Sequence, residues 1–347
     1  MPSRVALPIP KELSGHDHES KTRHSLSFAD GNIALLASNQ YFVVHQGVLF
    51  RHSAALKAAV EDLTANPHKT TSDGIPLLKV QEAPDDLFHF LSALYDGLSE
   101  IKYNTASFGM VAAILRLSTH YQVAHLRKQL LRGLTEMWPD NLTEWDLRES
   151  HATSDSGLYQ PRATIPHPIL IINLARDVNA PELLPAAFYD LSRSLPVHIT
   201  QGFRCSKTQE VHQLSSADLL ASLKGREHAS RFLSTFLVNY VEGRNPSPLC
   251  IYRRQHMDLS RQRACQAAFE GITFEILRES NDILCPRSSD PLFALMDSLL
   301  ILTREDGRSS RPCEFCRGDF EAVVDQARED FWRMLPDWFG VDVSTWV

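Results

Sequence analysis

The alternation of apolar and polar positions in the first part of the chain predicts a strand hairpin. Residues 33–37 and 41–44 are apolar runs, and Asn39 and Gln40 between them form a step as short as a two-residue hairpin turn. A further short apolar run, residues 77–80, follows a polar loop and is expected to be a third strand. We therefore expect a small sheet near the N-terminus.

Between and after these runs, the apolar positions repeat with helical spacing. Residues 47–63 indicate a compact and mostly buried helical pair. From Pro84 onward, apolar side chains recur every three or four residues, so one face of that helix should belong to the core. More helices are expected after it. A small sheet with helices clustered on it is an α+β domain.

The pattern changes twice along the chain, and these changes give the expected domain boundaries. Residues 1–24 show almost no apolar periodicity and are expected to be a mobile tail. Prolines and small polar residues dominate 139–166, which is the expected linker. The organisation is therefore an α+β domain over 25–138, followed by an all-α domain over 167–347 with a helix break at Gly225.

Local signals mark several helix ends in this second domain. Ser215 is expected to start one helix, and Asp290 followed by a proline is expected to start another. The last helix has the clearest apolar stripe, which runs from Phe320 to Leu335. Trp346 lies one residue from the end of the sequence, so we expect this end to dock on the helical domain.

Five side chains around the expected hairpin occur in an order that is typical of one domain family. They are Asp30, His45, Leu49, Ser53 and Tyr95. In this order, and together with the strand at 77–80 and the helical hairpin at 114–134, they resemble the BTB/POZ domain. The resemblance covers about residues 25–138.

The five residues are expected to have structural roles. His45 should be a core group at a strand–helix junction, with its ring satisfied by a backbone carbonyl. Ser53 should cap a helix, and Asp30 should form hydrogen bonds at a turn or strand end. No catalytic role is expected for any of them.

The resemblance implies a protein–protein interaction function. BTB domains self-associate as homodimers or bind a cullin scaffold as substrate adaptors of a ubiquitin ligase. The C-terminal half is similar to that of fungal BTB proteins with a helical C-terminal region, because Phe331 and Trp332 are followed by Pro336 and a closing Trp346. One position departs from the adaptor pattern, since residues 63–65 lack the glutamate that family adaptors tend to carry there.

The composition limits the cellular compartments and the kinds of partner that we expect. The chain has 347 residues, 43% of them hydrophobic, which is enough for two cores. Its formal net charge is −7, and neither sign forms a long block, which argues against a general nucleic-acid binder. No run approaches the roughly 20 apolar residues of a membrane helix, and the proline-broken N-terminus does not resemble a signal peptide. We expect an intracellular protein, cytoplasmic or nuclear, with no membrane contact.

An alternative function is transcriptional regulation with nucleic-acid contact. It would need a basic surface, and the only modest cluster is Arg253, Arg254, Arg261 and Arg263, which a solvated helix face explains equally well. The sequence motifs of nucleotide-binding, serine-hydrolase and zinc-protease sites are absent, so we expect no enzymatic activity.

Four cysteines form a candidate structural zinc site. Cys313 and Cys316 have the two-residue spacing that lets both sulfurs bind one ion, and Cys250 and Cys265 could supply the second pair, with His256 as a substitute. Fourteen residues separate Cys250 from Cys265, so only half of the spacing pattern is typical of zinc. The alternative is that these are reduced thiols that pack as small hydrophobic groups.

Overall fold

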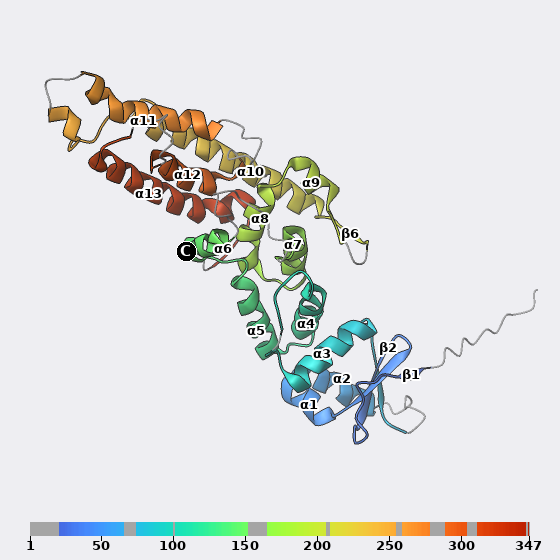
Figure 1. Ribbon diagram of the computed structural model, residues 1–347. Helices are drawn as coiled ribbons and strands as arrows, with labels where there is room; N and C mark the ends of the chain where they lie inside the picture. Colours follow the sequence, from blue (N-terminus) through green and yellow to red (C-terminus); the bar gives the residue numbers. More distant parts are fainter. Residues whose placement is uncertain are drawn as a thin grey trace, which may run out of the picture. The chain divides into compact units, whose positions relative to one another are not determined.

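The computed structural model shows a mixed α+β protein that is mostly helical (Figure 1). The described residues are 21–65, 74–99, 101–151, 165–205, 209–254, 259–277, 289–303, 311–344 and 346. The chain forms two compact units, residues 1–97 with 120–123, and residues 98–119 with 124–347. Among the described helices, none combines the length and the apolar character that crossing a membrane requires.

The first unit contains a sheet with the strand order β1-β3-β2-β4. β2 (Ile33–Ala37) and β3 (Gln40–Val44) form the expected antiparallel hairpin. β4 (Leu77–Val80) is the expected third strand, and it pairs in parallel with β2. The turn lies one position earlier than expected, because Gln40 already belongs to β3.

The predicted mobile tail was wrong at its C-terminal end. β1 (Thr22–Arg23) pairs in parallel with β3 inside the range that we assigned to the tail. The backbone N–H of Thr22 donates to the carbonyl of Asn39, and that of His24 donates to Tyr41, both at 2.9 Å. Residues 1–20 of the expected tail lie outside the described residues.

The helices of the first unit match the predicted spacing. They are α1 (Gln46–His52), α2 (Ala54–Ala65) and α3 (Pro84–Asp96). α1 and α2 are the expected helical pair, and α3 begins at the expected proline. The buried side chains of α3 are Leu87, Phe90, Leu91, Ala93 and Leu94, which form one apolar face.

The second unit is dominated by helices. In chain order its elements are α4 (Phe108–His120), α5 (Ala124–Thr135), α6 (Leu142–Ser150), α7 (Pro168–Asp177), η1 (Pro181–Leu183), α8 (Leu184–Ser192), α9 (Pro196–Gln201), β5 (Phe203–Arg204), β6 (Val211–His212), α10 (Ser216–Phe236), η2 (Leu237–Val241), η3 (Ile251–Arg254), α11 (Leu259–Leu277), α12 (Pro291–Thr303) and α13 (Glu314–Phe339).

α4 and α5 form the expected helical hairpin, but they belong mainly to the second unit, whereas we had placed them in the first domain. The reason is their side-chain contacts to α7. Arg116 of α4 forms an ion pair with Asp177, with 2.9 Å between Nε and the carboxylate. Arg127 of α5 donates to the carbonyls of Val178 and Asn179, just after α7.

The predicted linker over 139–166 contains a helix, so that prediction was wrong in its first half. α6 buries Trp145 and Arg148, and Asn141 caps its first turn by accepting a hydrogen bond from the N–H of Glu144 at 2.9 Å. Residues 152–164 lie outside the described residues.

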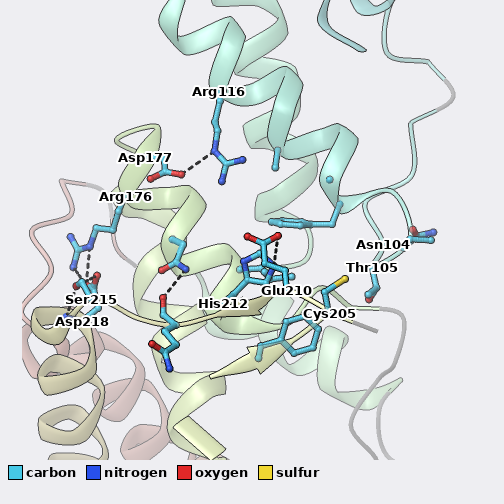
Figure 2. A pocket seen from close by; sticks show the side chains of 18 residues that line it. Asn104, Thr105, Arg116, Arg176, Asp177, Cys205, Glu210, His212, Ser215 and Asp218 are labelled. Carbon is cyan, nitrogen blue, oxygen red and sulfur yellow. Dashed lines mark hydrogen bonds and ion pairs between the residues drawn. The ribbon is translucent and has the colours of Figure 1, made fainter. Parts of the chain in front are cut away.

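A two-stranded ribbon corrects the expectation of an all-α second domain. β5 pairs with β6 in antiparallel register, with Phe203 opposite His212. Side chains of this ribbon line a pocket together with residues of α4, α7 and the start of α10 (Figure 2). Strands of two residues carry too little alternation to be recognised in the sequence.

Helix α10 runs through Gly225, where we had predicted a break. The glycine is explained by packing, because a Cβ at this position would lie 2.0 Å from a ring carbon of Phe339 in α13. Ser215 and Asp290 begin α10 and α12 as expected, since each accepts a hydrogen bond from a backbone N–H of the first turn.

The end of the chain docks on α13, as expected. The indole of Trp346 stacks on that of Trp332 at 5.0 Å, and its N–H donates to the Trp332 carbonyl at 2.8 Å. Gly340 ends α13 in the left-handed conformation, with φ 63°.

Candidate metal centre

Four cysteines from three separate segments of the second unit meet in one buried cluster. Cys250 directly precedes η3, Cys265 lies in α11, Cys313 directly precedes α13 and Cys316 lies in the first turn of α13. Their sulfur atoms all lie within 4.8 Å of one another. The most exposed of the four side chains, Cys313, is only 6% exposed. The structure thus brings together all four cysteines that the sequence proposed as ligands.

Two of the sulfur–sulfur distances match the edge of a tetrahedral thiolate site. The Sγ of Cys250 lies 3.8 Å from that of Cys265 and 3.8 Å from that of Cys313. A tetrahedron with metal–sulfur bonds of about 2.3 Å has sulfur–sulfur edges of about 3.8 Å. A disulfide would bring two sulfurs to about 2.05 Å, and all four thiols are free.

Backbone N–H groups point at sulfurs of the cluster, among them those of Cys265 and Cys316. The N–H of Cys313 donates to the Sγ of Cys265 at 3.2 Å, and the N–H of Ser247 donates to the Sγ of Cys316 at 3.3 Å. Such hydrogen bonds stabilise a thiolate more than a thiol, because the acceptor then carries a full negative charge. They also fix the direction of both side chains.

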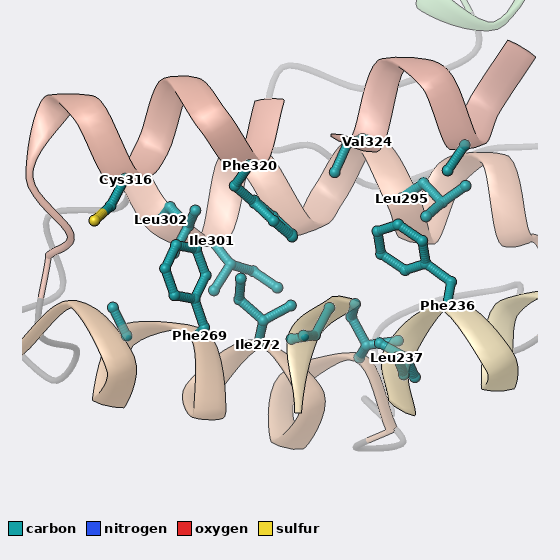
Figure 3. Close-up of a cluster of buried hydrophobic side chains, with 14 of the residues drawn as sticks. Phe236, Leu237, Phe269, Ile272, Leu295, Ile301, Leu302, Cys316, Phe320 and Val324 are labelled. Carbon is teal, nitrogen blue, oxygen red and sulfur yellow. The ribbon is translucent and has the colours of Figure 1, made fainter. Parts of the chain in front are cut away.

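An apolar core surrounds the cluster on its inner side. Figure 3 shows Cys316 beside Phe320 and Phe269, at one end of a row of buried side chains from α10 to α13. The guanidinium of Arg244 lies 5.4 Å and 5.3 Å from the centres of these two rings. Burial lowers the pKa of Arg244, whereas Asp319 and Cys316 raise it.

The thiols differ in how readily they ionise. Burial raises the pKa of Cys313, but hydrogen bonds from the backbone N–H groups of Cys316 and Ile251 outweigh it and lower the pKa to about 7. Burial raises the pKa of Cys265 to about 11, and it also raises the pKa of Cys316. One thiolate forms easily, and further ones require a nearby cation to compensate their charge.

Two residues near the cysteine cluster were not predicted from the sequence. Arg244 and Ser247 lie on the loop between η2 and Cys250, and no spacing rule connects them to a cysteine pair. His256, the proposed substitute ligand, lies outside the described residues. Of the basic cluster, the structure describes the side chains of Arg253 and Arg263, and both are exposed.

The BTB-like signature residues form a hydrogen-bonded network in the first unit. The Nδ1 atom of His45 lies 3.0 Å from the Tyr95 hydroxyl, which also accepts a hydrogen bond from the backbone N–H of His45 at 2.9 Å. The Nε2 atom lies 3.2 Å from a carboxylate oxygen of the exposed Asp30. His45 is half-buried and is satisfied by side chains, so the expected backbone carbonyl partner was wrong.

Ser53 and Leu49 occupy the positions expected for them. The Ser53 hydroxyl accepts from the N–H of Leu56 at 2.9 Å and donates to the Tyr121 carbonyl at 2.6 Å. It therefore caps α2 and also ties this helix to residues 120–123 of the same unit. Leu49 is fully buried.

No protein-family model matches the chain, and no curated protein has a significantly similar sequence.

Proposed function

We propose that this chain is a protein–protein interaction protein whose helical unit is held together by a structural zinc ion. The observation that carries the zinc proposal is the cluster of four buried sulfurs, which all lie within 4.8 Å of one another and have two edges of 3.8 Å. Zinc prefers thiolate ligands in tetrahedral geometry, and it compensates the charges that buried thiolates could not carry alone.

The donor set favours a structural ion over a catalytic one. Four cysteine ligands fill the tetrahedral positions of zinc, whereas catalytic sites keep one position open for water or substrate. Burial of all four side chains also separates the ion from solvent. We therefore propose no enzymatic activity for this centre.

Zinc would join segments that are distant in the sequence. Cys250 and Cys313 are separated by 62 residues, yet their sulfurs lie 3.8 Å apart. An ion bound there would link the loop before η3, helix α11 and the start of α13. Because the site forms only on folding, its binding free energy adds to the folding free energy.

Cobalt substitution tests the ligand set and the geometry. Metal is removed from the protein under reducing conditions. The metal-free protein is then titrated with Co²⁺ while its visible absorption spectrum is recorded. We expect the strong ligand-field and sulfur charge-transfer bands of tetrahedral cobalt thiolate, saturating at one equivalent and bleached by Zn²⁺. A weak spectrum typical of octahedral oxygen ligands would contradict the proposal. Cys205→Ser, outside the cluster, is the matched control and should not change the titration.

For the first unit we propose a BTB-like role in self-association or partner binding. The element order supports this proposal, because a hairpin, a helical pair, a third strand and a helix occur in the sequence expected for such a domain. The network of Asp30, His45 and Tyr95 supports it as well, since the signature residues lie in mutual contact.

Light scattering on the full chain tests the self-association proposal. We expect a dimer mass that persists on dilution through the micromolar range. Calorimetric titration with a purified cullin N-terminal region tests the proposal that the first unit is a cullin adaptor. A chain that stays monomeric and binds no cullin would contradict this role, and it would leave the zinc proposal untouched.

A further inference from the structure

A second candidate site lies in the helical unit, in a pocket that the metal centre does not use. Its volume is about 900 Å³, near the upper end of the range for small-molecule sites. It is lined by α4, by α7, by the β5–β6 ribbon and by the start of α10 (Figure 2). All of these segments belong to one compact unit.

Part of the lining is apolar and aromatic. Phe108 and Ala112 of α4 and Leu170 of α7 line the pocket together with Phe203 of the ribbon. The ring of Phe203 stacks on His167 at 4.5 Å and faces His212 at 6.4 Å, so its orientation is fixed. Such a lining favours the flat apolar body of a ligand.

Two arginines of the pocket are held in place by carboxylates. The Nε of Arg116 donates to Asp177 at 2.9 Å. Arg176 uses Nε and one terminal nitrogen on a single oxygen of Asp218, at 3.0 Å and 2.7 Å. Figure 2 shows both pairs at the edge of the pocket. Each guanidinium is thus oriented before any ligand binds, which reduces the entropic cost of using its remaining N–H groups.

The unused hydrogen-bonding groups of these side chains are mostly donors. Within the part of the chain that the structure describes, both terminal nitrogens of Arg116 and one of Arg176 have no protein partner. The amide of Asn104 uses its oxygen on Ser107, which leaves its N–H₂ group as a donor. A ligand rich in acceptor oxygens satisfies such a set.

The carboxylates of the pocket do not reverse this preference. The carboxylate of Asp218 accepts two hydrogen bonds from Arg176 and one from the Ser215 hydroxyl, whose oxygen in turn accepts from the backbone N–H of Asp218. Asp177 is paired with Arg116, and Glu210 lies 3.8 Å from His212. Because Asp177 and Asp218 are each paired with an arginine, these two carboxylates are already compensated in charge.

We propose that this pocket binds a small anionic molecule with a flat apolar body, whose acidic group is held by Arg116. The class includes aromatic carboxylates, sulfonates and phosphates. The apolar body lies against the lining that includes Phe108 and Phe203, and the acidic oxygens accept hydrogen bonds from the free N–H groups of the anchored guanidinium. This inference is independent of the zinc and BTB-like proposals.

Two fluorescent probes with similar apolar bodies test the proposal on the full chain. 8-Anilinonaphthalene-1-sulfonate carries an anionic group, and N-phenyl-1-naphthylamine is its uncharged counterpart. We expect saturable binding of one sulfonate probe per chain, tighter than binding of the neutral probe. Arg116→Gln should weaken the sulfonate at least about tenfold, as expected for lost charge-assisted hydrogen bonds. The affinity for the neutral probe should stay within about twofold.

Further variants separate binding in the pocket from binding elsewhere. Gly109 lines the pocket, and a Cβ there would meet no atom within 4 Å, so Gly109→Trp should fill the space and abolish binding of both probes. Arg231→Gln removes the same charge from an exposed pair with Glu227 outside the pocket, and it should change neither affinity. Equal binding of the two probes, an unchanged sulfonate affinity in Arg116→Gln, or full binding to folded Gly109→Trp would each overturn the proposal.

Discussion

The Tyr95 hydroxyl is the hydrogen-bonding partner of His45, for whose ring we had expected a backbone carbonyl. It accepts a hydrogen bond from the N–H of His45, so its own hydrogen is available for the Nδ1 atom of the same residue. The imidazole then carries its hydrogen on Nε2 and donates it toward Asp30. Sequence reasoning found the three residues but not this pairing, because Tyr95 lies 50 positions from His45.

Removing this hydroxyl should destabilise the first unit. Tyr95→Phe leaves the His45 N–H and Nδ1 without their partner, and we expect a loss of about 1–2 kcal/mol in the free energy of unfolding. Tyr41→Phe, at a half-buried tyrosine of the same unit, is the matched control and should cost less than about 0.5 kcal/mol. Urea denaturation measures both, and equal effects of the two variants would argue against the network.

At the scale of elements, apolar periodicity and caps predicted much of what the structure shows. The hairpin, the strand β4 and the helices α3 and α12 follow directly from alternation, helical spacing and an Asp–Pro start. The errors arose where tertiary contacts override local signals. α6 is rich in polar residues, yet Trp145 and Arg148 are buried in it. The four cysteines were predicted as one set, but only half of their spacing was typical, because tertiary packing and not local spacing brings Cys265 to Cys250.

Gly225 gives a direct test of packing against local preference. Gly225→Ala would place a methyl group against the Phe339 ring, and we expect a loss of about 1–3 kcal/mol from overpacking. Gly318→Ala, in an open position of α13, should instead stabilise by roughly 0.5–1 kcal/mol. Thermal or chemical denaturation of the two variants should therefore move in opposite directions, and a gain in Gly225→Ala would refute the packing explanation.

Helix α7 should lose stability in mild acid. The Nδ1 atom of His167 accepts a hydrogen bond from the N–H of Ile169 at 3.3 Å, and burial lowers the pKa of His167 to about 4. The unfolded chain binds this proton at a pKa of about 6.5, so the contribution is complete above that pH and is lost as the pH falls toward 4. The loss should reach roughly 3 kcal/mol at most.

His167→Asn keeps a capping side chain and removes the titration. Its free energy of unfolding should change less than that of the original chain between pH 7 and 4.5. His198→Asn, at an exposed position of α9, is the matched control. If the free energy of unfolding of His167→Asn depends on pH as that of the original chain does, protonation of His167 is not the cause of the loss in acid.

At the scale of the whole molecule, a buried charge network holds α6, α8 and the start of α12 together within the helical unit. Arg193 donates to Glu149 at 2.7 Å and to Asp290 at 2.9 Å, and Arg148 donates to Asp190 at 2.7 Å. Burial raises the pKa of Asp190, but the two arginines outweigh it and hold the pKa far below its usual range. Removing one member leaves buried charges without compensation.

Arg193→Met should therefore be among the most damaging substitutions in this unit. We expect a loss of about 3–5 kcal/mol, because three carboxylates lose a shared cation. Arg333→Met removes an exposed ion pair with Asp330 and should cost less than about 1 kcal/mol. Similar unfolding midpoints for the two variants would show that the network contributes no more than a surface pair.

The metal content of the full chain tests the central claim most directly. Elemental analysis of protein purified without a metal-binding tag should give one zinc per chain. Cys316→Ser should reduce this content well below one and lower the melting temperature, whereas Cys205→Ser should leave both unchanged. Less than one zinc in fully folded protein, or full zinc content in Cys316→Ser, would contradict the assignment of the four cysteines as a structural zinc site.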